Sequence, residues 1–265
     1  ELDLAAADLV CLAVPTADLP AALGQVADRL GPRTGLLVLS KGLVPPTGEL
    51  PTAYCTARAG GRSVACLGGP AHAADALEHG ASLVVASADR EFVAQVRHAL
   101  ADAGFDVQTT GDVVGVDLAG VAKNAAVLAA TTAAVLGPNA SGAAAGKVFS
   151  EVAAYASALG ARPATFAGLA GAGDLVASVV AAGGRNRRAG ELLARGVPSG
   201  EIRPALGQVA EALDALPLLV AALEARGVRA PATRALLEVV EGRESARSFA
   251  EHVTAPRRIV GTRVA

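Results

Sequence analysis

Residues 9–43, LVCLAVPTADLPAALGQVADRLGPRTGLLVLSKGL, decide the fold class of this chain. The apolar run at residues 9–14 ends at Pro15 and is typical of a parallel strand that is buried on both faces of a sheet. The apolar positions within residues 19–30 have the spacing of one helix face. A second short apolar run follows at residues 35–39. The stretch therefore predicts a strand, a helix and a second strand.

The same alternation continues to about residue 110. It predicts strands at residues 63–70, 81–87 and 105–109, with helices at residues 71–80 and 90–103. Such alternation indicates an α/β doubly wound sheet. From Asp112 onward the strand patterns give way to long apolar helices. We therefore expect two domains, an α/β domain at residues 1–110 and an all-α domain at residues 111–265.

The charge of the chain argues against nucleic acid as a partner. The formal net charge is −2 and the pI is about 6.1, so no basic field surrounds the protein. We expect small molecules and other protein subunits as partners. The first ten residues carry no signal-peptide pattern, which favours a cytoplasmic location. Because methionine is absent even at position 1, we also expect a further segment before Glu1.

Two other features suit a soluble protein in a reducing compartment. The cysteines Cys11, Cys55 and Cys66 are odd in number and lie in or beside apolar stretches, so we expect buried free thiols. Residues 118–137 are as long as a membrane span, but a lysine and an asparagine interrupt them, so we predict a buried helix and no membrane span. His72 and His79 lack a third ligand nearby, and we expect no metal site.

Lys123 and Asn124 are that polar pair inside an apolar helix. A buried lysine has a pKa lowered toward neutrality and can exchange a proton with a substrate oxygen, while the amide of Asn124 orients that oxygen. The alternative is a core lysine whose ammonium reaches water. We favour the catalytic interpretation because Lys123 has apolar neighbours on both sides.

Three further groups are candidates for the same site. Asp174, in a glycine-rich stretch, could hold the Lys123 ammonium or could simply cap a helix, and Ser178 would lie one turn further on the same face. The arginines of residues 183–188, GGRNRR, could bind phosphate at a helix start or be a solvated charge run. Glu211 could accept a hydrogen bond from a ribose hydroxyl, or it could be an exposed helix carboxylate.

The ends of the predicted strands point to one crevice. Ligands of open α/β sheets bind beyond the carboxyl ends of the strands. Pro15, Lys41 and the Gly69-Pro70 pair each follow a predicted strand, so we expect them to converge there. The helical domain would close that crevice.

Taken together, these motifs resemble one enzyme family. They are VP at 14–15, SKGL at 40–43, GGPAHA at 68–73, DVVGVDLAGVAKN at 112–124, GLAGAGDL at 168–175, GGRNRR at 183–188 and GQVAE at 207–211. Their order and spacing are similar to those of the NAD(P)-dependent glycerol-3-phosphate dehydrogenases over nearly the whole chain. Within that resemblance, residues 1–110 are what remains of a Rossmann-like dinucleotide-binding domain. Residues 111–265 are the helical substrate-binding and catalytic domain.

The resemblance implies a reaction and a role for each site residue. The reaction is the reversible reduction of dihydroxyacetone phosphate to sn-glycerol 3-phosphate with NADH or NADPH, which supplies glycerophospholipid synthesis. Lys123 matches the family's proton donor and acceptor, with Asn124 and Asp174 beside it. The residues that match the substrate side are Lys41, Gly69, Lys123, Asp174, Ser178, Arg185 and Asn186. Those expected on the cofactor side are Pro15, Lys41, Ala73, Arg185, Val209 and Glu211.

The sequence also departs from the family pattern. A serine of the pocket wall is Ala71 here, and a lysine of the usual NAK stretch is Ser141. We expect these changes to alter affinity before chemistry. The glycine-rich strand, turn and helix that begin the family's cofactor domain do not occur in the sequence, so we expect the domain to be incomplete at its N-terminus and to bind NAD(P) poorly without that unit.

Two other functions remain open at this point. One is a non-catalytic remnant or interaction protein that has lost cofactor binding. The other is a related hydroxy-acid or ketopantoate-type dehydrogenase, since such folds also place a lysine and an asparagine on a helix of the second domain. The arginine cluster argues for a phosphorylated substrate. The apolar helix surface of the second domain favours a homodimer.

Overall fold

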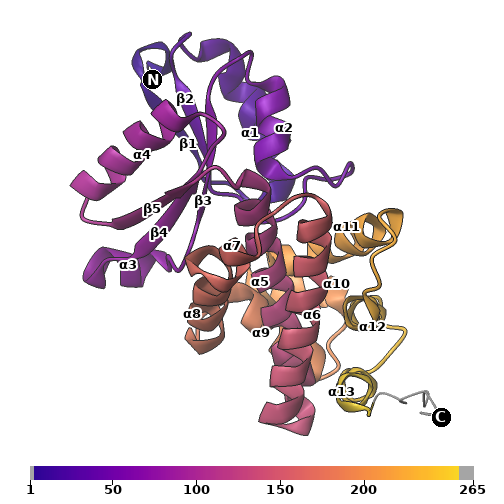
Figure 1. Cartoon of the computed structure of the whole chain (residues 1–265). Coiled ribbons are helices and arrows are strands. Elements are labelled where there is room, and N and C mark those ends of the chain that lie inside the picture. The colour runs from indigo at the N-terminus through magenta and orange to yellow at the C-terminus, as the bar shows by residue number, and fades with distance from the viewer. Residues whose placement is uncertain (1–2, 257–265) are drawn as a thin grey trace, which may run out of the picture.

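The computed structural model describes residues 3–256. A five-stranded sheet with helices on both faces makes up its first part, and a cluster of helices makes up the second. Figure 1 shows the two parts one above the other, with the long helix α5, Val113–Ala133, leading from the sheet into the helical part. The prediction of a doubly wound α/β part followed by an all-α part is confirmed.

The sheet is mixed. Its strands lie in the order of the sequence: β1 Leu9–Leu12, β2 Gly35–Val38, β3 Val64–Gly68, β4 Ser82–Ala86 and β5 Asp106–Thr110. The first three strands are parallel, and β4 then pairs antiparallel to β3. The connection between β3 and β4 holds only the short helix α3, Ala73–His79, so the chain returns beside β3 in the opposite direction. The last strand, β5, is parallel to β4.

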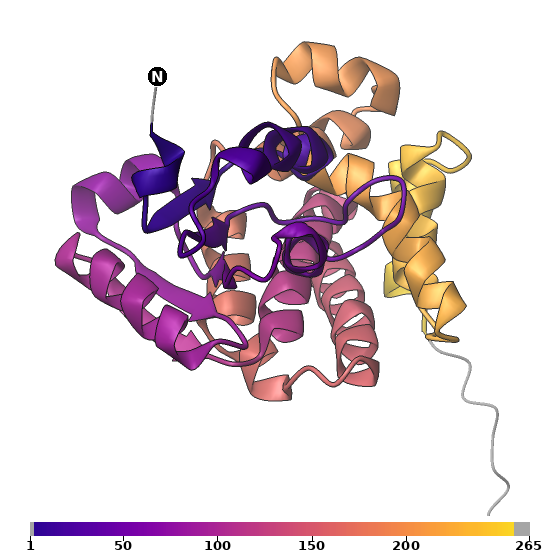
Figure 2. The same ribbon diagram turned by 90° about the horizontal axis from the view of Figure 1, so that it is seen from above.

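Helices cover both faces of the sheet, as Figures 1 and 2 show. One face packs against α1, Leu19–Val26, and α2, Pro51–Arg58, in a core that includes Leu19, Leu36 and Cys55. The other face packs against α4, Arg90–Asp102, whose Phe92 and Val96 are buried. Short 3₁₀ turns complete this part: η1 Leu4–Ala6, η2 Thr16–Asp18 and η3 Ala27–Arg29.

Two predictions for the first strand are wrong. β1 is only partly buried, and Cys11 is exposed, whereas Cys55 and Cys66 are buried as expected. The cause is position, since β1 lies at the edge of the sheet and pairs only with β2 among the described strands. An apolar run cannot by itself distinguish an edge strand from a central one.

The helical part is built around α5, of which most residues are buried. Around it lie α6 Pro138–Ala158, α7 Pro163–Ala167, α8 Asp174–Val180, α9 Arg185–Ala194, α10 Ser199–Leu206, α11 Glu211–Ala225, α12 Pro231–Val240 and α13 Ala246–Thr254. The short turns η4, Ala134–Leu136, and η5, Leu169–Gly173, link the helices before and after them.

The length of α5 alone does not mark it as a membrane span. Val113–Leu136 and Pro163–Val180 are long and apolar enough to cross a membrane by length and composition. In the first, 83% of the most apolar window is buried inside the fold, as expected for a core helix. The second is divided among α7, η5 and α8.

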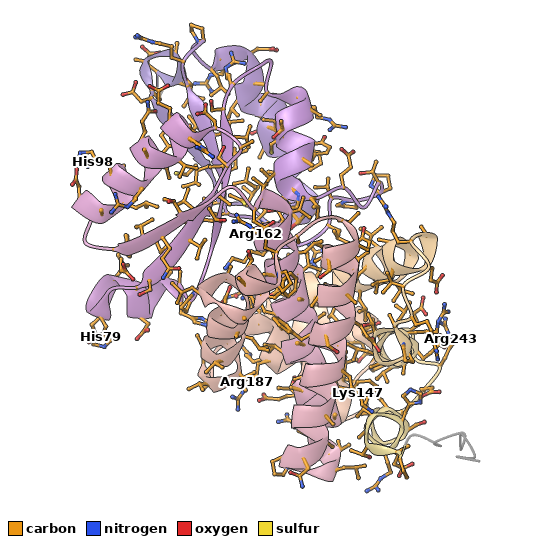
Figure 3. All side chains as sticks on the ribbon, viewed as in Figure 1. His79, His98, Lys147, Arg162, Arg187 and Arg243 are labelled. Atoms are coloured by element: carbon orange, nitrogen blue, oxygen red, sulfur yellow. The ribbon has the colours of Figure 1, made fainter. Side chains whose placement is uncertain are left out.

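Asp112 fixes where α5 begins and what lies beside it. Its carboxylate accepts a hydrogen bond from the Gly115 amide (3.0 Å), which caps α5. It also accepts from the Arg162 amide (2.9 Å) and from the Thr165 hydroxyl, at the start of α7. Figure 3 shows Arg162 where α7 approaches the sheet. The segment that leads through η5 to α8 is thereby anchored to α5.

Candidate active site

Asp174, at the start of α8, holds two lysines from different parts of the fold. Its Oδ2 lies 2.7 Å from Nζ of Lys41, which follows β2. Its Oδ1 lies 3.4 Å from Nζ of Lys123, in the middle of α5. The Asp174 side chain is 3% exposed, so these two cations surround a carboxylate that has almost no contact with water.

Three neighbours complete the contacts of this cluster. The Lys123 ammonium donates to the Ser178 hydroxyl (3.2 Å), and that hydroxyl donates to Asp174 Oδ1 (3.3 Å). The Lys41 ammonium also donates to the Gly69 carbonyl oxygen (3.4 Å). Lys41, Gly69, Lys123, Asp174 and Ser178 are therefore brought together in one place.

Glycines make this convergence sterically possible. Gly69 has φ +101°, and a Cβ there would lie 2.8 Å from the Ser82 carbonyl oxygen, so only glycine suits the turn after β3. A Cβ on Gly120 would lie 3.2 Å from Cγ of Lys41, which packs against α5 at this point. A Cβ on Gly171 would overlap the Phe166 backbone just before α8.

Burial and charge act in opposite directions on Lys123. Burial lowers the pKa of its amine below the ordinary value, the nearby Lys41 charge lowers it further, and the anionic Asp174 and Glu211 partly offset both effects. For Asp174, burial raises the pKa, but the charges of Lys41 and Lys123 and their hydrogen bonds outweigh it, so the net shift is downward. Lys123 is thus an amine prepared for proton transfer beside a permanent anion.

Asn124 lies beside the cluster and bonds within the protein. Its amide nitrogen donates to the backbone carbonyl of Lys41 (3.0 Å) and lies 3.4 Å from Glu211 Oε2, and the residue is 5% exposed. Both contacts use the NH₂ group of the amide, so the predicted role of Asn124 in orienting a substrate oxygen stays a prediction. In this arrangement Asn124 fastens the Lys41 segment to α5.

Glu211 lies at the start of α11 and faces the same cluster. Burial raises the pKa of its carboxyl group, against the opposing charges of Arg185, Lys123 and Lys41 and the backbone amide of Thr16. It is therefore a partly buried carboxylate among cations and not the exposed helix residue of the alternative interpretation.

The arginine-rich motif opens α9, and its members differ in their contacts. Arg185 is exposed at the first position of the helix. The Asn186 side-chain oxygen accepts from the Ala212 amide (3.1 Å), which caps α11 and leaves its NH₂ group as a donor. Arg187 bonds Glu191 and the Val179 carbonyl oxygen, pointing outward in Figure 3. Of the three arginines in this motif, Arg185 is the one whose charge lowers the pKa of Glu211.

Several of the predicted cofactor residues line one pocket beside Glu211. Pro15, Thr16, Gly42, Val209 and Glu211 line it, together with apolar side chains. The Thr16 hydroxyl is buried without a hydrogen-bond partner among the described residues. A mostly apolar cleft at the ends of β1 and β2, with the two carboxylates of Glu211 and Asp214 and one unsatisfied hydroxyl, fits the nicotinamide half of a dinucleotide. Ala73 is the exposed first residue of α3 and is not among the residues that line this pocket.

Two buried polar residues near the site were not singled out from the sequence. Thr16 lies in the turn after β1, and Asp117 lies on α5 two turns before Asn124. Asp117 could have been noticed, since it is a carboxylate in an apolar helix. Nothing in the sequence distinguishes Thr16 from an ordinary turn threonine.

Two protein-family models match this chain, one over its α/β part and one over its helical part. The model for the NAD-dependent glycerol-3-phosphate dehydrogenase C-terminus matches residues 112–251, and the model for the N-terminus of the same family matches residues 2–93. The chain belongs to the NAD-dependent glycerol-3-phosphate dehydrogenase family.

Individual relatives agree with this membership. The glycerol-3-phosphate dehydrogenase [NAD(P)+] of Deinococcus radiodurans is 36% identical over 254 residues, which are 94% of this chain and 74% of the relative. That of Corynebacterium kroppenstedtii is 37% identical over 240 residues, or 88% and 72% of the two chains. The crystal structure of glycerol-3-phosphate dehydrogenase from Coxiella burnetii superposes with a TM-score of 0.87 at 24% identity, over 94% of this chain and 77% of that one, which shows that the fold is the same.

Proposed function

We propose that this family member catalyses the reversible reduction of dihydroxyacetone phosphate to sn-glycerol 3-phosphate with NAD(P)H. The observation that carries the proposal is the Lys41–Asp174–Lys123 cluster, with contacts of 2.7 and 3.4 Å. Reducing a ketone requires a proton for the carbonyl oxygen and positive charge to stabilise the alkoxide that forms. One lowered-pKa amine and a second ammonium, both held by one carboxylate, meet those two requirements.

Lys123 gives its proton to the oxygen on C2 of the substrate, and takes it back in the reverse direction. When bound, the nicotinamide cofactor supplies or accepts the hydride at C2. Lys41 contributes a second positive charge near that oxygen, and Asp174 keeps both amines at the site. Water is largely excluded there, since the side chains of Lys123 and Asp174 are 13% and 3% exposed.

The substrate phosphate binds at the start of α9. Arg185 offers a guanidinium fork, Asn186 offers its NH₂ group, and the first amides of α9 have no partner within the helix. Because Gly183 and Gly184 precede Arg185, the backbone can approach an anion closely. Binding the phosphate here holds the ketone at a fixed place relative to Lys123.

The cofactor residues divide into two groups. Three of them, Pro15, Val209 and Glu211, line the pocket at the ends of β1 and β2. Lys41 immediately precedes Gly42, which also lines this pocket. Arg185 and Ala73 would contact the cofactor from outside this pocket. We further propose that the enzyme supplies glycerophospholipid synthesis, acts in the cytoplasm and forms a homodimer.

An activity assay on the purified full-length protein, with any residues that precede Glu1 included, tests the proposal. Oxidation of NADH and NADPH is followed at 340 nm with dihydroxyacetone phosphate or with ketopantoate as the second substrate. We expect oxidation with dihydroxyacetone phosphate alone, because only that substrate carries the phosphate that α9 is built to bind. Reduction of ketopantoate, or binding of NAD(P)H without reduction of either ketone, would contradict the proposed function.

A further inference from the structure

The segment that carries Lys41 is fastened to α5 at both of its ends. At one end the Asn124 amide donates to the Lys41 carbonyl oxygen (3.0 Å). At the other, the amide and the hydroxyl of Thr52, in the first turn of α2, donate to the two carboxylate oxygens of Asp117 (3.2 and 2.9 Å). The chain between Lys41 and Thr52 is thereby held at two points on one helix.

The two anchors lie on the same face of that helix. Asp117 and Asn124 are seven residues apart, which is close to two turns of an α-helix. Between them Gly120 leaves room for the aliphatic stem of Lys41. The next turn of α5 presents Lys123, so a single helix sets the positions of both lysines.

Asp117 also supplies α2 with the N-terminal cap that its own sequence lacks. Leu50, the residue before α2, has no side-chain oxygen, and no side-chain cap is formed there. The Asp117 carboxylate accepts the Thr52 amide that would otherwise be unpaired, and its negative charge lies at the positive end of the helix. With only 6% of Asp117 exposed, this bond is shielded from water.

We propose that Asp117 is a positioning residue, which fixes Lys41 beside Asp174 and Lys123 by anchoring the start of α2 to α5. The inference rests on the proposed function, in which Lys41 acts at the substrate. Asp117 touches neither lysine in the described contacts, so its effect is indirect. Losing this anchor leaves the far end of the Lys41 segment free to shift relative to α5.

The lysine count of the chain allows a direct test. Only Lys41, Lys123 and Lys147 occur, so ¹³C,¹⁵N-lysine labelling gives three side-chain signals. Lys147 lies on α6 beside α13, where its ammonium donates to the Val253 carbonyl, and it serves as the internal reference (Figure 3). The signals are recorded without substrate or cofactor for the wild type, Asp117→Asn and Thr52→Val. Thr52→Ser, which keeps both donors, is the matched control.

In Asp117→Asn and Thr52→Val we expect the Lys41 signal to move and its ammonium protons to exchange faster, while the Lys147 signal stays in place. Thr52→Ser should match the wild type. Wild-type Lys41 signals in a folded Asp117→Asn protein, or equal shifts of all three lysines, would overturn the proposal. If Asp117→Asn does not fold, Thr52→Val decides: a wild-type Lys41 signal, or equal shifts of all three lysines, would overturn the proposal there as well.

The turnover of dihydroxyacetone phosphate provides a second readout. Thr52→Val should lower kcat about tenfold, as expected when a reacting group is misplaced by a fraction of an ångström, with little change for Thr52→Ser. A moved Lys41 signal with unchanged kcat would overturn the positioning role. An inactive wild type would instead count against the proposed function, and the lysine signals would still show whether Asp117 places Lys41.

Discussion

The carboxylate of Asp174 lies 3.4 Å from the ammonium nitrogen of Lys123, although 50 residues of chain lie between these two positions. Burial and the neighbouring Lys41 lower the Lys123 pKa, and the Asp174 charge opposes this. The pair therefore sets the pH range over which Lys123 keeps the proton that ketone reduction needs.

Replacing Asp174 tests that balance. In Asp174→Asn the opposing charge is lost, so the Lys123 pKa falls further and ketone reduction declines at a lower pH than in the wild type. We also expect kcat to drop about tenfold or more, because the two lysines lose their shared anion. The profile of kcat against pH measures both effects. Ser178→Ala should shift the profile less, since its hydroxyl is neutral, and an alkaline limb that stays at the wild-type pH would contradict the assigned role of Asp174.

Arginine variants test the phosphate site at α9. Arg185→Ala should raise KM for dihydroxyacetone phosphate about tenfold or more, as expected for a charge-assisted hydrogen bond of roughly 2 kcal/mol. Arg188→Ala is the matched control, since it removes an equal charge from an exposed position on the same helix. Steady-state kinetics at saturating NADPH measure both. Equal effects of the two variants would indicate only general electrostatic attraction.

Much of this arrangement was predictable from local pattern. The alternation of apolar runs predicted strands and helices close to their observed bounds, and a lysine inside an apolar helix marked Lys123. The antiparallel pairing of β4 with β3 was not predictable, because strand direction depends on how a connection folds back. The exposure of Cys11 depends on which strand lies at the sheet edge. The hydrogen bond from the Asn124 amide to the Lys41 carbonyl oxygen was not predictable either, because it depends on how the segment after β2 packs against α5.

The pH dependence of folding tests the environment of Asp117. Burial raises the pKa of its carboxyl group to about 6, even though hydrogen bonds from Thr52 and Cys66 act in the opposite direction. The native state therefore keeps a proton that the unfolded chain releases near pH 4. The resulting contribution to the free energy of unfolding is fully present below about pH 4 and is lost as the pH rises through about 6. Its total is about 3 kcal/mol by linkage.

Asp117→Asn should remove this dependence. Between pH 4 and 7 the free energy of unfolding of the variant should fall less steeply than that of the wild type. Urea unfolding followed by far-ultraviolet circular dichroism measures it. Asp106→Asn, at the exposed start of β5, should keep the wild-type slope. Parallel pH profiles for the wild type and Asp117→Asn would show that the carboxyl group is not shifted.

The role of Lys123 as the proton donor in the reduction of dihydroxyacetone phosphate is tested by replacing that lysine. The measurement is kcat for NADPH oxidation with dihydroxyacetone phosphate, with Lys147→Ala as an equal loss of charge on α6, away from the cluster. We expect Lys123→Ala to lose at least about a hundredfold in kcat and Lys147→Ala to keep the wild-type rate. A Lys123→Ala protein that turns over at a near-normal rate would show that Lys123 is not the proton donor.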